Sequence, residues 1–123
     1  MLEQAAALLP AQRTCHYGVT REGAVFLDRL PASLSPADRV LITDAQLATG
    51  EELCACLDEL LRRGAEVASI RVVACVAAPP ALKRLSEEYP GLRLYVAIID
   101  ELVDDSGRIV PGIGDAAQRC FGY

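Results

Sequence analysis

The sequence predicts an α/β domain built on a mostly parallel sheet flanked by helices. Three apolar runs, Arg39–Asp44, Ile70–Ala77 and Leu92–Ile99, are nearly uninterrupted, as strands buried on both faces usually are. Two segments with apolar residues at helical spacing, Glu51–Arg63 and Pro80–Glu88, separate these runs. Strands that alternate with helices in this way indicate βαβ units and a parallel sheet.

The ends of the two helices are marked by residues that favour helix starts and stops. Glu51 and Glu52 place negative charge in the first turn of the first helix. Arg62 and Arg63 place positive charge in its last turn, and Gly64 ends it. The second helix begins with proline, which is tolerated in a first turn.

The flanking segments are less regular. Before the first parallel strand the sequence predicts a helix ended by Pro10, two short strands around the Glu22-Gly23 turn, and a surface connection. After the last parallel strand it predicts a glycine-rich tail that turns helical from Gly114 or Asp115. The first helix is expected at Met1–Leu9, the two strands at Thr14–Val19 and Ala24–Leu30, the connection at 31–36 and the tail at 106–123.

Composition narrows the class of protein. The 123 residues contain no linker or repeat, so we expect one domain over residues 1–123. Apolar residues make up 52% of the chain, but no run approaches the roughly 20 residues that span a membrane. The net charge of −5 argues against nucleic-acid binding, which depends on Lys and Arg.

The five cysteines have no metal-site spacing, and the single histidine, His16, has no second ligand nearby. We interpret the cysteines as small buried hydrophobic residues in a reducing compartment. The first eleven residues lack the basic start of a secretory signal. A cytoplasmic location is therefore expected, or an organelle if a targeting segment lies upstream.

Candidate site residues follow the predicted strands. In parallel sheets ligands bind outside the carboxyl ends of the strands, so the loops Asp44–Gly50, Ala77–Pro80 and Asp100 onward should share one rim. The first is a small-residue turn before a helix, where N–H groups and the helix dipole favour an anion. Farther along, Val110–Asp115 has two glycines that allow close approach of a flat ligand. Each loop alone could equally be an ordinary turn.

Together and in this order, these segments resemble the uracil phosphoribosyltransferase family. The first loop matches the family's phosphoribosyl pyrophosphate loop, Asp-Pro-Met-Leu-Ala-Thr-Gly-Gly-Ser/Thr, at Asp44 and at Leu47–Gly50. The tail from Ile109 to Gly122 is similar to the family's uracil loop and C-terminus almost residue for residue. The segments Val76–Pro79 and Tyr95–Asp100 are similar to two further strand ends.

The resemblance implies the phosphoribosyltransferase fold, with this chain corresponding to the C-terminal two-thirds of the family domain. It implies transfer of ribose 5-phosphate from phosphoribosyl pyrophosphate to N1 of uracil, which gives UMP and pyrophosphate in pyrimidine salvage. Mg²⁺ would accompany the phosphoribosyl pyrophosphate, with no direct protein ligand set. Family members are oligomeric, so a homo-oligomer is a further expectation.

The resemblance also assigns roles to individual residues. Two carboxylates would be catalytic: Asp44 would face the ribose hydroxyls, and Asp115 would meet a Mg²⁺-bound water or the diphosphate. The remaining roles are the 5-phosphate cradle, backbone reading of the uracil edge, and a contact to the diphosphate. The cradle would be formed by Ala48, Thr49 and Gly50. The uracil edge would be read by the backbone of Ile109 and Gly114, and the diphosphate would contact Arg21.

One departure from the family falls inside the phosphate loop. The family's Gly-Ser/Thr after Thr-Gly is Glu51-Glu52 here. A carboxylate about 4 Å from a phosphate costs roughly 4 kcal/mol at an effective dielectric near 20, or about a thousandfold in affinity. Thr49 and Glu52 also fit a capping box that would occupy the N–H groups of the helix start. Alternatively, both Glu side chains turn outward and the cradle survives.

Two other departures concern what surrounds the site. The chain has no counterpart of the family's Arg-Ala-Gly diphosphate loop, so apolar sheet surface should be exposed unless a partner covers it. The arm between Arg21 and Leu30 is shorter than in the family, which bears on dimer formation.

Three hypotheses remain open on the sequence. The chain is a uracil phosphoribosyltransferase domain, a non-catalytic descendant that binds uracil, UMP or a partner, or an α/β domain with no function at its rim. Conversion of uracil to UMP distinguishes the first, and thermal protection by uracil or UMP distinguishes the second from the third.

Overall fold

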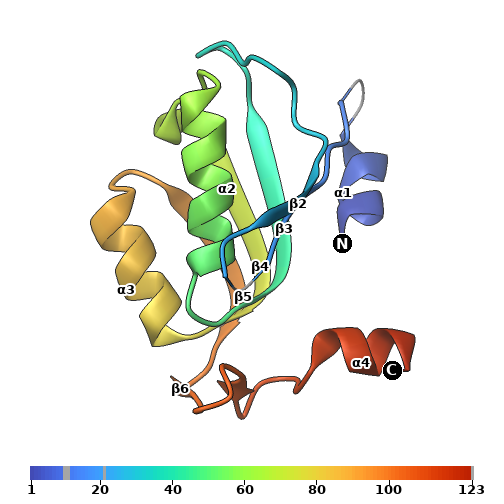
Figure 1. Ribbon diagram of the computed structural model, residues 1–123, viewed down its shortest axis with the longest axis vertical. Helices are drawn as coiled ribbons and strands as arrows, with labels where there is room; N and C mark the ends of the chain where they lie inside the picture. Colours follow the sequence, from blue (N-terminus) through green and yellow to red (C-terminus); the bar gives the residue numbers. More distant parts are fainter. Residues whose placement is uncertain (10–11, 21, 123) are drawn as a thin grey trace.

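The computed structural model describes residues 1–9, 12–20 and 22–122 (Figure 1). Its centre is a parallel sheet of β3 (Val40–Leu47), β4 (Ile70–Ala77) and β5 (Arg93–Ile99), in the order β3-β4-β5. Helices α2 (Glu51–Arg62) and α3 (Pro79–Glu88) connect successive strands. This arrangement confirms the predicted α/β class and all three parallel strands.

The hydrophobic core lies between the sheet and the two connecting helices. Figure 1 shows α2 and α3 side by side on one face of the sheet. Leu57 of α2 and Ala81 of α3 are fully buried there, against Ile70 and Val72 of β4. Burying a Leu or Ile side chain contributes about 1.5–3 kcal/mol, so this face holds the layers together.

The shorter elements are peripheral. Helix α1 precedes an antiparallel pair, β1 and β2; a 3-10 turn precedes β4; a second antiparallel pair, β6 and β7, follows β5; and α4 ends the chain. Helix α1 spans Leu2–Leu8, β1 spans Tyr17–Val19 and β2 spans Val25–Asp28. The 3-10 turn spans Val67–Ser69, β6 spans Leu102–Val103, β7 spans Ile109–Val110 and α4 spans Ala116–Phe121. The β6–β7 pair was not predicted, because strands of two residues leave no periodic pattern.

Arg63, at the end of α2, ties the β1–β2 arm to the main layer. Its guanidinium donates to the carbonyls of Leu30 at 3.0 Å and Pro31 at 2.9 Å. It also forms ion pairs with Asp28 of β2 and Glu59 of α2. Hydrogen bonds from Arg62 and Arg63 lower the pKa of Glu59 to about 2, so this cluster stays charged over the neutral range.

The second face of the sheet is only partly covered. Tyr95 and Ile99 on β5 are 54% and 61% exposed, and Leu41 on β3 is 38% exposed. Exposed apolar sheet surface is predicted by the sequence, and the structure confirms it. Within the described residues, no helix combines the length and apolar character needed to cross a bilayer.

Tyr89, at the end of α3, offers a test of the packing of α2 against α3. Its side chain is 5% exposed, and its hydroxyl donates to Asp58 Oδ1 at 2.7 Å. We predict that Tyr89→Phe lowers the free energy of unfolding by about 1–2 kcal/mol, because a buried hydrogen bond is lost. Chemical denaturation measures it. Tyr95→Phe, on the exposed sheet face, is the matched control and should be close to neutral; equal effects would contradict this packing.

Candidate functional site

The carboxyl ends of the three parallel strands meet at one edge of the sheet, as predicted. The Ala78 N–H donates to the Leu47 carbonyl, and the Asp100 N–H donates to the Ala77 carbonyl, both at 2.9 Å. These bonds join the end of β3 to that of β4, and the end of β4 to the residue after β5. The loops that follow the strands therefore start from a common, fixed rim.

Strand β3 is longer than predicted, which changes the setting of Asp44. The predicted strand ends at Asp44, but the pairing of β3 with β4 continues to Leu47 opposite Ala77. Asp44 therefore lies inside the strand rather than in a loop. The error arose because the polar residues Asp44 and Gln46 were read as the start of a turn.

Asp44 is partly buried and has an altered pKa. Burial raises the pKa of its carboxyl above the ordinary value, while hydrogen bonds from the N–H groups of Gln46 and Ala45 act in the opposite direction. The Gln46 N–H lies 3.2 Å from Asp44 Oδ1. The Asp44 charge also contributes, after burial, to raising the pKa of Cys56 on α2 to about 11. Asp44 thus faces the helix-covered side of the sheet.

The predicted capping box at the start of α2 is wrong. The N-cap is Gly50, not Thr49, and no side chain caps it. Gly50 has a φ of 81°, and a Cβ there would lie 3.3 Å from Ala81 Cα of α3. The close approach of α3 fixes this turn, and glycine satisfies its left-handed conformation without a side-chain cap.

Glu51, the first residue of α2, extends toward α3. Its carboxylate lies 3.2 Å from the guanidinium of Arg84. The alternative in which both Glu side chains turn outward is met only in part by Glu51, whose side chain is 60% exposed but pairs with Arg84. The turn at residues 47–50 is hereafter called the first turn. It leads into a helix of 12 residues that has no side-chain cap at its N-terminus.

The second turn, residues 110–115, follows the β6–β7 hairpin. Ile109 is 2% exposed and packs with Val76 and Ala78, so β7 is anchored to the end of β4. The Gly112 N–H donates to Asp100 Oδ2 at 2.8 Å. Gly112 has a φ of 52°, and a Cβ there would lie 2.2 Å from the Ile109 carbonyl oxygen, which leaves room only for glycine.

Asp115 caps the start of helix α4. Its Oδ1 accepts the Gln118 N–H at 2.9 Å, and its Oδ2 lies 3.9 Å from the Arg108 guanidinium. One oxygen is thus used as a helix cap, and the other is held by a longer ion pair that a ligand could replace. The helix was expected from Gly114 or Asp115, and it begins one residue later, with Asp115 as its cap.

One hydrogen bond joins the end of β3, next to the first turn, to the second turn. The side-chain Nε2 of Gln46 donates to the carbonyl of Gly114 at 3.0 Å, across 68 positions of sequence. Both groups are partly buried, which protects the bond from competition with water. The first and second turns therefore lie at the same end of the molecule, as a shared site requires.

The structure brings most of the predicted site residues to this rim. Asp44 precedes the first turn on β3, and the predicted phosphate and uracil residues lie at or beside the two turns: Ala48, Thr49, Gly50, Ile109, Gly114 and Asp115. Arg21, the predicted diphosphate contact, lies outside the described residues. The sequence did not predict Gln46 or Asp100 as site residues. For Asp100 one signal was present, since it is an acidic residue directly after the apolar run of β5.

The described residues contain no group of three or more His, Cys, Asp or Glu able to hold a metal ion. Mg²⁺ binds proteins through one or two carboxylates together with substrate phosphates. Asp115, with one oxygen free of the helix cap, fits a Mg²⁺ that arrives with a diphosphate. It does not fit a cation held by protein ligands alone.

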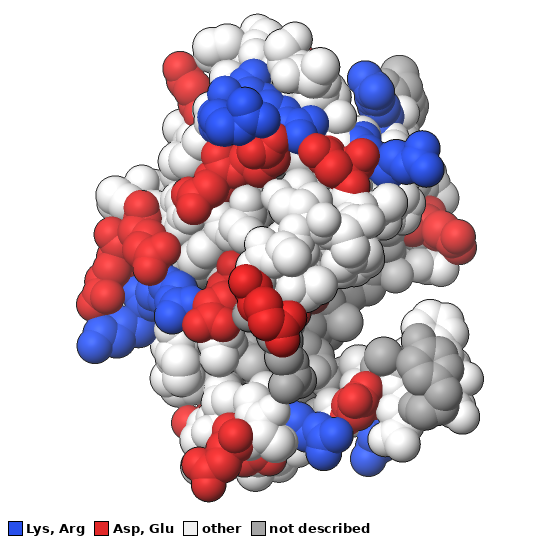
Figure 2. Space-filling view, in the orientation of Figure 1, with Lys and Arg blue, Asp and Glu red and all other residues white. Residues whose placement is uncertain are grey.

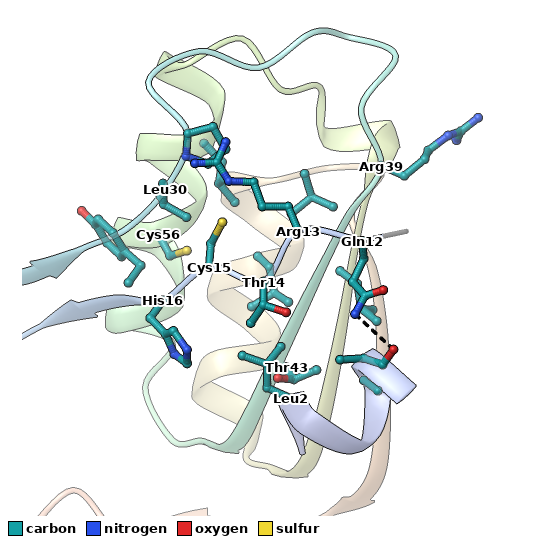
Figure 3. Close-up of a pocket in the computed structure, with 18 of the residues that line it drawn as sticks. Leu2, Gln12, Arg13, Thr14, Cys15, His16, Leu30, Arg39, Thr43 and Cys56 are labelled. Carbon is teal, nitrogen blue, oxygen red and sulfur yellow. Dashed lines mark hydrogen bonds between the residues drawn. The ribbon is translucent and has the colours of Figure 1, made fainter. Parts of the chain in front are cut away.

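A cavity of about 850 Å³ lies along the open edge of β3 and not between the two turns. Figure 3 shows it bounded by Gln12–His16, by Thr43 of β3, by Cys56 of α2 and by Leu2 of α1. Its lining includes Asp44 but no residue of either turn. Of the candidate site, Asp44 therefore borders this cavity, whereas the two turns lie outside it.

Comparison with known proteins shows the family of this chain. The family model described as uracil phosphoribosyltransferase matches residues 1–123, the whole chain. The chain belongs to the uracil phosphoribosyltransferase family. The curated uracil phosphoribosyltransferase of Nicotiana tabacum is 42% identical over 99% of this chain, and that of Nostoc sp. is 46% identical over the same share.

A solved structure has a fold similar to that of this chain. The AQ2163 protein from Aquifex aeolicus is similar over 98% of this chain, with a TM-score of 0.84 and 31% sequence identity. This chain spans 58% of that structure and 57–59% of the tobacco and Nostoc relatives. The share is somewhat below the two-thirds expected from the resemblance.

The second turn of this family member can be tested with two glycine variants. Gly107 and Gly112 both have positive φ, but a Cβ meets nothing within 4 Å at Gly107 and would clash with the Ile109 carbonyl at Gly112. Gly107→Ala should cost only the left-handed penalty of about 1–2 kcal/mol. Gly112→Ala should cost more, because the backbone must also move. Denaturant titration gives both values; equal values would show that the second turn is not closely packed.

Asp44 gives a pH-dependent prediction. Because burial raises its pKa, the folded state binds the Asp44 proton more tightly than the unfolded state does, and stability falls as pH rises above about 4. Asp44→Asn keeps an oxygen acceptor for the Gln46 N–H and removes the charge. We predict that the variant is more stable than the native chain at pH 7 and that this gain disappears at pH 3. Thermal unfolding at both pH values tests this; lower stability of the variant at pH 7 would contradict it.

Proposed function

We propose that the chain carries the ribose-phosphate and uracil sites of a uracil phosphoribosyltransferase, and that these sites take part in forming UMP and pyrophosphate from uracil and phosphoribosyl pyrophosphate. The observation that carries the proposal is the hydrogen bond of 3.0 Å between Gln46 and Gly114. It sets a turn suited to a phosphate beside a turn suited to a flat base. A nucleoside monophosphate has these two parts at a short separation.

The first turn would bind the 5-phosphate through backbone groups. Residues 48–50 lead into α2, whose N-terminal N–H groups and dipole favour a dianion. Ala48 and Thr49 are half-buried, so the phosphate would be partly shielded from water. Asp44, three residues before the end of β3, would accept hydrogen bonds from the ribose hydroxyls.

The second turn would read the uracil edge. Ile109 and Gly114 offer main-chain groups, and main-chain N–H and C=O groups complement the amide-like edge of uracil. Gly112, fixed by its bond to Asp100, allows the ring to approach the backbone. Specificity for a pyrimidine would then depend on backbone geometry and not on a charged side chain.

Transfer would depend on positioning and on stabilising developing charge, because the sugar passes through an oxocarbenium-like state. Bound Mg²⁺ would neutralise the diphosphate leaving group. Asp115 would orient that end of the substrate with its Oδ2, which Arg108 holds at 3.9 Å. Arg21 is a further candidate for the diphosphate contact.

A second candidate function is a uracil- or UMP-binding or partner-binding module without turnover. It is favoured by Glu51 at the start of α2, by the helix-capping role of Asp115, and by the exposed sheet residues Tyr95 and Ile99. An apolar sheet face of this kind is a common partner surface. A homo-oligomer formed through this face is one version of the proposal.

Two measurements separate the candidates. We expect UMP to raise the unfolding temperature of the native chain, because a ligand that binds only the folded state stabilises it. Conversion of labelled uracil to UMP in the presence of Mg²⁺ tests catalysis, and Asp115→Ala should abolish any such conversion. Thermal protection without conversion favours the binding module. Protection by neither uracil nor UMP would contradict the transferase and the uracil- or UMP-binding module, and would leave only the partner-binding version.

A further inference from the structure

Glu51 and Arg84 form an ion pair beside the first turn. Their nearest oxygen and nitrogen are 3.2 Å apart, with side chains 60% and 34% exposed respectively. Glu51 opens α2, and Arg84 lies in the middle of α3. In Figure 2 basic side chains over α3 meet acidic side chains at the start of α2. The pair thus links the proposed phosphate site to a neighbouring helix.

The position of Arg84 is set by the packing of α3. Ala81, one helical turn earlier, is fully buried against the Gly50 turn, and Leu85 is 3% exposed in the core. Residues three and four apart share a face of a helix, so Arg84 faces the same side as Ala81. A second carboxylate, Glu88 on α3, lies 3.8 Å from Arg84 and helps to orient it.

Glu51 would hinder phosphate binding if it were not paired. A carboxylate in the first turn of a helix is attracted by the N–H groups that a phosphate needs, and it also repels the phosphate. Glu51 stands where the resemblance to the family predicts glycine. This chain therefore carries a charge next to the phosphate cradle that the family loop lacks.

We propose that Arg84 is a positioning residue for the phosphate site of this chain. Its guanidinium holds the Glu51 carboxylate toward α3 and offsets its charge, which leaves the N–H groups of the first turn available to a phosphate monoester. The inference rests on the proposed function, and it assigns a role to a residue outside both turns.

The experiment measures UMP and uracil affinities by calorimetry for the native chain, Arg84→Gln, Glu51→Gln and the double variant. Arg84→Gln should weaken UMP binding about threefold to tenfold and leave uracil binding unchanged, because uracil carries no phosphate. In the double variant UMP affinity should return to that of Glu51→Gln, because the charge that Arg84 offsets is gone. Arg84→Lys should retain most of the affinity.

Lys83→Gln is the matched control, since Lys83 is exposed on the same helix and its removal changes the net charge equally. It should not change UMP affinity. High salt should reduce the Arg84→Gln effect, because the Debye length is about 3 Å at 1 M. If the native chain binds UMP and the Arg84→Gln affinity is unchanged, or if the double variant does not recover, the inference is wrong. If the native chain binds neither UMP nor uracil, the proposed function is wrong and the inference fails with it.

Discussion

The parallel pairing of β3, β4 and β5 is the constraint on which the site depends. It brings three strand ends to one edge, where main-chain bonds from Ala78 to Leu47 and from Asp100 to Ala77 lock them together. Because these bonds lie within the rim itself, the loops that follow have little freedom in where they start. Gln46 then connects the first turn to the second through Gly114. The site is thus a consequence of the sheet.

Electrostatics at this rim are balanced by local pairs. Glu51 is matched by Arg84, and Asp115 is shared between the Gln118 N–H and Arg108. Among the described residues no cation lowers the pKa of Asp44, and burial raises it. A partly buried carboxylate without a cationic partner destabilises the folded chain at neutral pH, and this is a common feature of sites that bind or transform a substrate.

Much of the fold could be predicted from the sequence because its strands are apolar runs with sharp ends. Ile70–Ala77 was predicted to the residue, since Pro79 follows it and a helix begins there. The end of β3 was misplaced because Asp44 and Gln46 are polar although they pair in the sheet. At the site, the sequence predicted residues that lie at or beside the two turns, but the Gln46–Gly114 bond joins positions too distant for any local pattern to indicate. The same holds for Arg84, whose proposed role depends on the packing of α3.

The most direct test of the account follows every backbone amide by NMR while UMP is added to the native chain. If one ligand spans both turns, amides of residues 48–51 and 112–115 should shift together and report a single dissociation constant, while those at the exposed Tyr95 stay unchanged. Shifts confined to one turn, or two turns that saturate at different UMP concentrations, would show that the two turns do not form a joint nucleotide site.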